Sequence, residues 1–277
     1  MTGGNSKTSV EASFDDGISW CYLPGLPREL KEHSQSGLVA CGGYDVRNLC
    51  WTFGSGAWNQ THTLLHNRNV HTAWNSPSGV LLMGGFESEL NTEILNNEGL
   101  STESFSLDQR SGSSCAIELD TKVIITGGSY VSKIVRAYDS EGLIEDEVLP
   151  DLLKGRYSHG CGHYVNNDNK IVYLVTGGAD LDTYQALSST EILISGSETW
   201  LEVGDLPVPL VAMQGVSIHN TIILTGGAGQ NFDAFNVVLS FNITSEEWHQ
   251  VGEMREKRHS HGVSLVSAED VSDFCSK

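Results

Sequence analysis

The sequence is poor in basic residues and has no long apolar run. It contains 16 Lys and Arg residues against 35 Asp and Glu residues, which gives a formal net charge of −19. Phosphate backbones and anionic lipid surfaces are bound through Lys and Arg, so we expect no nucleic-acid partner. No apolar stretch approaches the ~20 residues that span a bilayer, so we expect no membrane insertion. The acidic balance favours solubility and would steer a basic partner toward the protein.

Several motifs of known chemistry are also missing. None of the six cysteines forms a C-x-x-C pair, so a zinc knuckle is not supported. There is no G-x-S-x-G elbow, no P-loop and no H-E-x-x-H motif. We therefore assign no catalytic residue, no metal and no cofactor, and an enzyme is not the favoured class. Residues 1–4 lack the charged and apolar regions of a signal peptide.

Glycine is abundant and recurs at a regular spacing. The chain has 30 glycines and 6 prolines, and a Gly-Gly pair repeatedly ends a short apolar run. The first glycines of these pairs are Gly3, Gly42, Gly84, Gly127, Gly177 and Gly226. A period of roughly 40 to 50 residues indicates a solenoid or a propeller.

Each repeat unit reads as a set of short strands. β-branched runs are bounded by Gly, Asn, Asp and Ser, which is typical of strands joined by turns. A third run is nearly identical in two units, at residues 92–95 and 190–193. A fourth run carries a tryptophan in four units, namely Trp20, Trp58, Trp200 and Trp248. We expect almost no helix, because no long apolar pattern with a 3.6-residue period is present.

The Gly-Gly pair and the later tryptophan resemble the kelch repeat, and the resemblance covers nearly the whole chain. It implies an all-β fold, a six-bladed kelch-type β-propeller that forms a single domain over residues 1–277. The rings of Trp58, Trp200 and Trp248 are then expected to pack between blades. Residues 258–266 read as a first strand and residues 1–4 as the end of a second strand, so one blade would be completed from both chain ends. Either residues 271–275 fill that second strand, or the natural chain begins earlier.

The motif Arg-x-x-His occurs three times, at Arg68, Arg156 and Arg258. One hypothesis is a ring of donors for an anionic group near the channel mouth, since guanidinium groups bind carboxylates bidentately. The alternative is that these side chains tie adjacent blades together. His159 and His163 would stand ~13 Å apart on a strand, too far to share a metal ion.

Loops on a rigid scaffold commonly carry function, and the loops after the Gly-Gly pairs are rich in interface residues. We expect a protein or peptide partner to bind this loop face. The predicted partner-binding residues are Tyr44, Arg47, Phe86, Tyr130, Tyr184, Phe232, Arg68, Arg156 and Arg258. A propeller enzyme or a carbohydrate-binding protein that uses the channel mouth is the main alternative. A substrate adaptor for ubiquitin ligation is a third, although such adaptors usually carry oligomerisation domains.

The six cysteines can be arranged in three pairs. Cys41 and Cys50 flank a hairpin loop, and Cys115 and Cys161 hold equivalent places on neighbouring inner strands. The remaining two, Cys21 and Cys275, both belong to the blade shared by the chain ends. Full pairing would favour a secreted or extracellular protein over a cytoplasmic one, while free buried thiols are the alternative.

Overall fold

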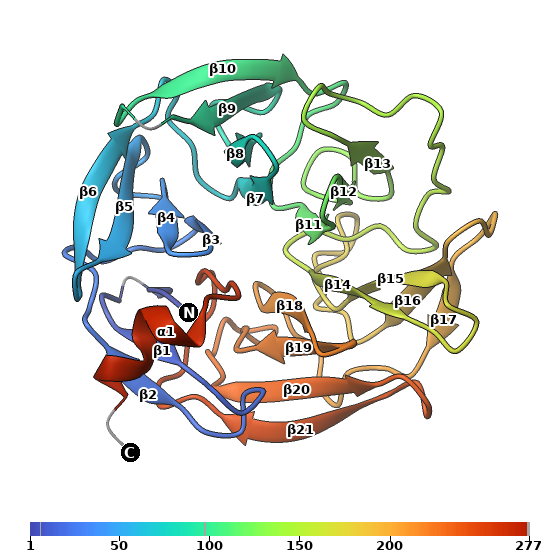
Figure 1. Ribbon diagram of the computed structural model, residues 1–277. Helices are drawn as coiled ribbons and strands as arrows, with labels where there is room; N and C mark the ends of the chain where they lie inside the picture. Colours follow the sequence, from blue (N-terminus) through green and yellow to red (C-terminus); the bar gives the residue numbers. More distant parts are fainter. Residues whose placement is uncertain (6, 97, 276–277) are drawn as a thin grey trace.

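The structure is a computed structural model that describes residues 1–5, 7–96 and 98–275. Its strands form separate antiparallel sheets arranged in a ring around a central axis (Figure 1). The fold is an all-β propeller, as the sequence predicts. Helical structure in the described residues is limited to α1 (Ala268–Val271) and the 3-10 turn η1 (Ser272–Phe274). No helix in the part of the chain that the structure describes is long and apolar enough to cross a membrane.

Five sheets contain three or four strands in sequential antiparallel order. The first comprises β3 (Ser34–Ser36), β4 (Val39–Cys41), β5 (Leu49–Gly54) and β6 (Ala57–Thr63). The second comprises β7 (Thr72–Ser76), β8 (Gly79–Met83), β9 (Asn91–Leu95) and β10 (Ser101–Ser106). The third has only β11 (Cys115–Glu118), β12 (Val123–Thr126) and β13 (Val135–Tyr138).

The last two of these five sheets have four strands each. One comprises β14 (Gly160–Val165), β15 (Ile171–Thr176), β16 (Thr190–Ile194) and β17 (Leu201–Val203). The other comprises β18 (Gln214–Ile218), β19 (Thr221–Thr225), β20 (Val237–Asn242) and β21 (Glu247–Glu253). In each of these five sheets the first strand lies next to the channel and the later strands lie progressively further out (Figure 1).

The expected count of six blades is wrong, because the structure has five. The remaining sheet has only two strands, β1 (Val10–Ala12) and β2 (Cys21–Leu23). Single bridges join Thr2 to Val10 on one side and to Gly262 on the other. Both chain ends therefore meet beside β1, but residues 263–266 form no strand, so this unit lacks the inner half of a blade.

The Gly-Gly pairs join each unit to the next through a backbone hydrogen bond. The N–H of Gly43 donates to the carbonyl of Arg68 at 3.1 Å, and the N–H of Gly227 donates to the carbonyl of Arg258 at 2.9 Å. A Cβ on Gly226 would lie 2.3 Å from that same Arg258 oxygen. Glycine is required there because any side chain would collide with the neighbouring backbone. Equivalent bonds start from Gly4, Gly85, Gly128 and Gly178.

A closed belt of backbone hydrogen bonds lies just before the innermost strands. Six residues, one from each unit, form the belt. The N–H of each residue donates to the carbonyl of the one before it in the chain, at 2.7 to 2.9 Å, and the N–H of the first, Glu32, donates to the carbonyl of the last, Ser260. All members have positive φ values between 48° and 59°. They are Glu32, Val70, Ser113, Ser158, Ala212 and Ser260. The belt passes through the β1–β2 unit as well, so the ring is closed despite the incomplete sheet.

The three disulfides have the pairing that the sequence predicts. Cys41–Cys50 joins β4 to β5 within one sheet, with Cα atoms 4.1 Å apart. Cys115–Cys161 joins the inner strands β11 and β14 of neighbouring sheets, with Cα atoms 6.0 Å apart. Cys21–Cys275 ties β2 to the segment after α1 across 254 residues. No described cysteine is free.

The predicted tryptophans are buried where neighbouring sheets meet. Trp58, Trp200 and Trp248 have exposed fractions of 8%, 1% and 5%. Each indole N–H donates to the preceding unit, where the acceptors are the carbonyls of Pro24 and Pro150 and the hydroxyl of Thr190. These rings fill the space between sheets and also satisfy their own polar group, so their packing role is confirmed.

We expect Trp200→Ala to lower the free energy of unfolding by about 3–5 kcal/mol, because it removes a fully buried ring and one hydrogen bond. Urea unfolding followed by circular dichroism measures the change. The matched control is Leu201→Ala on the next residue, which is half exposed and should change stability by less than about 0.5 kcal/mol. Equal effects of the two substitutions would contradict the assigned packing.

Candidate functional site

The arginines of the Arg-x-x-His motifs lie inside the sheets. Arg68, Arg156 and Arg258 have no exposed surface. The guanidinium of Arg68 donates to the carbonyl of Gly84 at 2.8 Å and forms an ion pair with Glu93. The carboxylate of Glu93 also accepts the backbone N–H of Leu65 at 2.7 Å. Gly84 follows β8 and Glu93 lies in β9, so the acceptors of this guanidinium belong to the sheet that Arg68 itself precedes.

The other two arginines repeat this geometry. Arg156 donates to the carbonyl of Gly177 at 2.8 Å and pairs with Glu191 at 2.5 Å. Arg258 donates to the carbonyl of Gly3 at 2.6 Å and pairs with Glu11 at 2.5 Å. The guanidinium groups are thus occupied by protein acceptors. This corrects the hypothesis that Arg68, Arg156 and Arg258 present donors to an anionic ligand, because none of them reaches the channel.

The glutamate partners were not identified from the sequence. The signal was present, because the third strands Thr92-Glu93-Ile94 and Thr190-Glu191-Ile192 belong to the same units as Arg68 and Arg156. Burial alone would raise the pKa of Glu93, but hydrogen bonds from Ser101 and Arg68 outweigh it, and the pKa lies below its ordinary value. The pair therefore stays ionised inside the sheet.

Two other units place apolar side chains at the same positions. Leu210 stands where Arg156 does, because its carbonyl accepts the hydrogen bond from Gly178. Leu239 occupies the position of Glu191. Each lies two residues after the residue whose carbonyl accepts the N–H of the first glycine of its pair, which is Gly226 for Leu239 and Gly177 for Glu191. Both leucines are buried in one cluster. Leu30 and Trp51 occupy these positions in the β3–β6 sheet and share another cluster. The ion pair is therefore replaceable by apolar packing within this fold.

We expect Arg156→Leu alone to cost about 3–5 kcal/mol, because it leaves the Glu191 carboxylate buried without its cation. The double variant Arg156→Leu/Glu191→Leu copies the Leu210–Leu239 pair and should recover most of that loss, since apolar replacement of a buried pair is often neutral. Chemical unfolding of the two variants measures this. A double variant less stable than the single one would show that the charges are needed in this sheet.

Four histidines lie in a ring where neighbouring units meet. His71, His159 and His261 place Nε2 at 2.7 to 2.9 Å from the hydroxyls of Ser34, Thr126 and Thr225 of the preceding sheet. His33 does the same with Thr2 at 2.7 Å. Burial, followed by the charge of the nearby arginine, holds the pKa of His159 and of His261 well below the usual value. Burial also lowers the pKa of His33 to about 3. These rings are neutral contacts between units.

The free energy of unfolding should fall as the pH is lowered below about 6.5. A histidine with a depressed pKa in the folded state binds its proton only after unfolding, so each contributes a slope of about 1.4 kcal/mol per pH unit below its unfolded pKa. Stability measured from pH 7 to pH 5 should show this slope. His159→Gln should reduce the slope by about one proton. An unchanged slope in His159→Gln would contradict the assignment.

The loops after the Gly-Gly pairs, residues 44–48, 86–90, 129–134, 179–189 and 228–236, form what we call the loop face. The first three loops contact one another. Arg47 forms an ion pair with Glu87 of the next loop and lies 5.7 Å from the ring centre of Tyr44. Phe86 packs edge-on against Tyr130 with ring centres 6.0 Å apart. Four of the predicted residues thus form a continuous group, and each is partly exposed.

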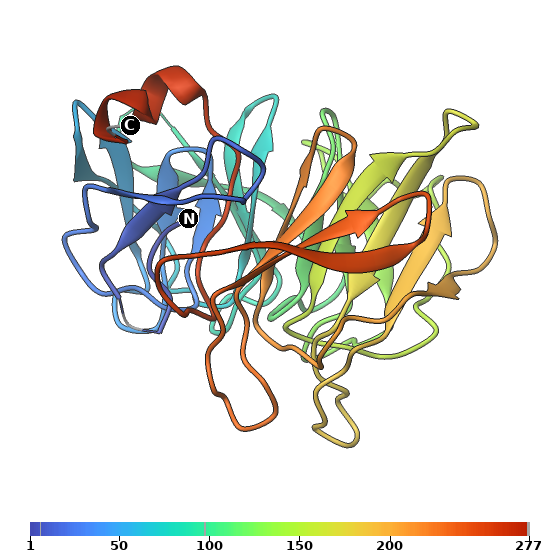
Figure 2. The same ribbon diagram turned by 90° about the horizontal axis from the view of Figure 1, so that it is seen from below.

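The last two loops form a second group on the same face. They project beyond the rest of the ring, on the side opposite α1 (Figure 2). Tyr184 and Phe232 are 66% and 71% exposed, and both have positive φ values. The side chain of Gln230 donates to the carbonyl of Tyr184 and accepts the N–H of Ala186, which fixes the two loops together. No contact between the described residues joins Tyr184 or Phe232 to the Phe86–Tyr130 pair.

The channel mouth on the side of α1 holds a separate polar cavity of about 280 Å³. Glu118 and His163 line it together with Asn75, Ser217 and Ser264. Glu118 is reachable from the channel but has protein on most sides, and burial raises its pKa to about 7. Neither residue belongs to the predicted site. Among the described residues no group of three potential metal ligands comes together.

The molecule is therefore a β-propeller with an exposed aromatic loop face and a polar channel mouth. No protein-family model matches the chain, and no curated protein shows significant similarity to it. The class rests on the arrangement of the sheets.

Proposed function

We propose that the protein is a kelch-type propeller that binds a protein or peptide through its loop face. The observation that carries this proposal is the exposure of Tyr184 and Phe232 on loops that are fixed to each other. Exposed aromatic side chains on rigid loops are favoured in interface cores because they bury large areas with little loss of side-chain entropy. Tyr44, Arg47, Phe86 and Tyr130 would extend the contact around the same face.

The charge around the two aromatic residues supports a basic partner segment. Asp180 and Asp182 lie in the same loop as Tyr184, and Asp233 follows Phe232. Hydrogen bonds from the backbone and side chain of Thr183 keep the pKa of Asp180 below its ordinary value, so this carboxylate is ionised. A Lys or Arg side chain would gain both a carboxylate and an aromatic face. The net charge of −19 would steer such a segment toward the propeller.

We further propose that residues 1–277 act as one domain and that the protein is extracellular. Three disulfides with no free described cysteine support an oxidising compartment. The kelch assignment is supported by the Gly-Gly contacts and by the tryptophans between sheets.

A carbohydrate-binding protein or an enzyme that uses the channel mouth is the alternative. The specific observation in its favour is the cavity with Glu118, His163 and several hydroxyl groups. A protonated or ionised carboxyl beside hydroxyl groups suits a neutral, hydroxylated ligand.

A panel of peptides that differ only in Lys and Arg content would test the proposal. The wild type should bind basic peptides, and the double variant Tyr184→Ser/Phe232→Ser should lose at least about tenfold in affinity, since each cation–aromatic contact is worth roughly 0.5–2 kcal/mol. Leu201→Ser, at the exposed rim strand β17, is the matched control and should bind as the wild type does.

The proposal would be overturned if the loop variant bound basic peptides normally. A thermal shift with neutral sugars that disappears in Glu118→Gln would favour the channel mouth instead, because only a ligand of the folded state raises its stability.

A further inference from the structure

Two asparagines on the outer part of the ring lie in the acceptor motif for N-linked glycans. The motif Asn-x-Thr occurs at residues 59–61 and 242–244 and at no other place in the sequence. Asn59 lies in β6, and Asn242 is the last residue of β20, directly opposite the first residue of β21. A glycan is bulky and needs an acceptor on the surface. Both asparagines are exposed, so both positions have room for the modification.

The side-chain amide of Asn242 is held with its nitrogen free. Its Oδ1 accepts the backbone N–H groups of Thr244 and Ser245 at 2.9 and 3.1 Å, which fixes the side chain against the turn. Its Nδ2, the atom that would carry the glycan, donates to no acceptor among the described residues. Asn220, in the turn between β18 and β19, differs because its Nδ2 donates to the carbonyl of Val165 in the neighbouring sheet at 2.9 Å. The asparagine within the acceptor motif is thus the one with an available nitrogen.

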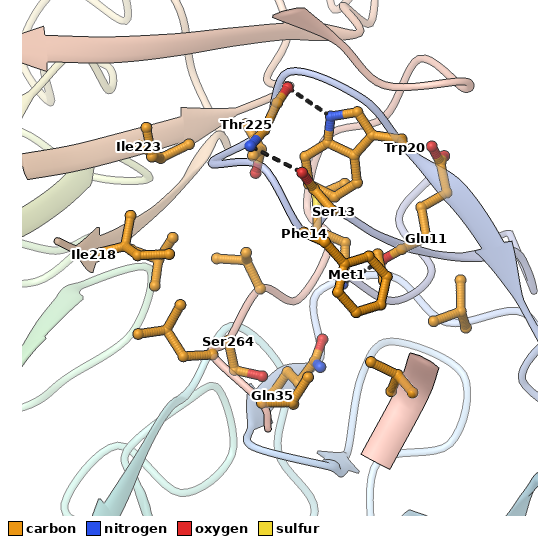
Figure 3. Close-up of a pocket in the computed structure, with 18 of the residues that line it drawn as sticks. Met1, Glu11, Ser13, Phe14, Trp20, Gln35, Ile218, Ile223, Thr225 and Ser264 are labelled. Carbon is orange, nitrogen blue, oxygen red and sulfur yellow. Dashed lines mark hydrogen bonds between the residues drawn. The ribbon is translucent and has the colours of Figure 1, made fainter. Parts of the chain in front are cut away.

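The alternation of side chains along β6 turns Asn59 outward. Trp58, the preceding residue, is buried and lines an apolar cavity of about 530 Å³ beside β1 (Figure 3). Successive side chains of a strand point to opposite faces, so Asn59 faces away from this cavity. Its Nδ2 donates only to the carbonyl of Ala57, at 3.4 Å. A glycosylated amide keeps one N–H, so a glycan and this hydrogen bond are compatible.

Both positions lie at the end of their sheets that is opposite the loop face. The third strands β5 and β20 begin where loops of the loop face end, so the turns that join them to the fourth strands lie at the far end. A Cβ on Gly56, in the first of these turns, would lie 3.0 Å from the ring of Phe274, which follows α1. The loop face projects on the side opposite α1 (Figure 2). Glycans at Asn59 and Asn242 would therefore leave the loop face open.

The two positions also belong to the longest edge strands of the molecule. β6 and β21 have seven residues each, more than any other described strand, and each is the last strand of its sheet. The exposed positions of β6 carry no charged side chain. Uncharged edge strands can pair with the edge of another chain, and native proteins prevent this by covering or charging the edge. A glycan at Asn59 would cover the edge of β6.

We propose that Asn59 and Asn242 carry N-linked glycans. The proposal rests on the extracellular compartment proposed above, because this modification is made on secreted chains. The three disulfides support that compartment. The glycans would cover the outer part of the ring on the side of α1, and they would leave the loop face as the surface for a protein or peptide partner.

Glycopeptide mass spectrometry tests the two positions. The 277-residue chain is secreted from eukaryotic cells behind a cleavable signal sequence, and peptide-N-glycosidase should then convert Asn59 and Asn242 to aspartate. Thr61→Ala and Thr244→Ala should each abolish one glycan, because the motif loses its hydroxyl group. Thr61→Ser and Thr244→Ser are the matched controls, which keep the motif and should keep both glycans. Serine at position 61 also keeps the hydroxyl contact with Thr52.

A new acceptor motif on the loop face tests the role of position. Asp233→Thr turns residues 231–233 into Asn-Phe-Thr, whereas Asp233→Val removes the same carboxylate without creating the motif. A glycan at Asn231 should weaken the binding of basic peptides at least about tenfold relative to Asp233→Val. The double variant Thr61→Ala/Thr244→Ala should bind these peptides as the wild type does.

The outcomes separate this proposal from the proposed partner binding. An asparagine that stays unmodified in the secreted chain is overturned as a glycan site, whether or not basic peptides bind. Protein from its native source that has three intact disulfides but no glycan would also overturn the proposal, while leaving the extracellular compartment in place. Free thiols in that protein would overturn the compartment and the glycans together.

Discussion

The hydrogen bond from the second glycine of each pair to the next unit is the contact on which the ring depends. It occurs at all six Gly-Gly pairs, from Gly4 to Gly227. Two glycines are needed because the first must admit the neighbouring carbonyl, and the second, whose N–H donates to it, has a positive φ and a Cβ on it would meet other backbone, such as the Lys31 oxygen at 2.8 Å from Gly43. At Gly42, for example, a Cβ would lie 2.6 Å from the Arg68 oxygen. The histidine rings lie against these glycines, and the belt residues follow the acceptor residues closely in the chain. One close approach between backbones therefore positions the other contacts of the inner wall.

The side chains behind that contact vary more than the contact itself. Three units use a buried arginine and glutamate, and two use apolar residues at the same positions. Burying an ion pair carries a desolvation penalty that apolar packing avoids. The pair therefore contributes by holding specific acceptors in place as much as by lowering the free energy of the folded state. This is clearest at Arg258, which binds Gly3, Ser9 and Glu11 from the other end of the chain. Together with Cys21–Cys275, that arginine closes the ring.

The sequence predicted most of the repeated features, but it mispredicted the number of blades and the role of the repeated arginines. The Gly-Gly spacing and the buried tryptophans follow from repeated positions, and the three disulfides follow from the places that their cysteines take in the expected strands. The missing sixth blade was not predicted, because a repeat count cannot show that residues 263–266 form no strand. The role of Arg68, Arg156 and Arg258 was also missed. An Arg-x-x-His pattern looks the same whether its guanidinium faces the channel or a glutamate 25 to 35 residues later, as with Glu93 and Glu191.

The same constraint explains where binding can occur. The arginines, histidines and glycines of the inner wall are buried and hydrogen-bonded to other protein groups. They are therefore not available to bind a partner. Residues outside these contacts are free to differ, and they lie in the loops after the Gly-Gly pairs and at the channel mouth. The loops carry exposed aromatic residues with nearby carboxylates, whereas the channel mouth holds Glu118, His163 and several hydroxyl groups. A charged segment and a hydroxylated ligand would therefore be recognised on opposite faces of the ring by different physical means.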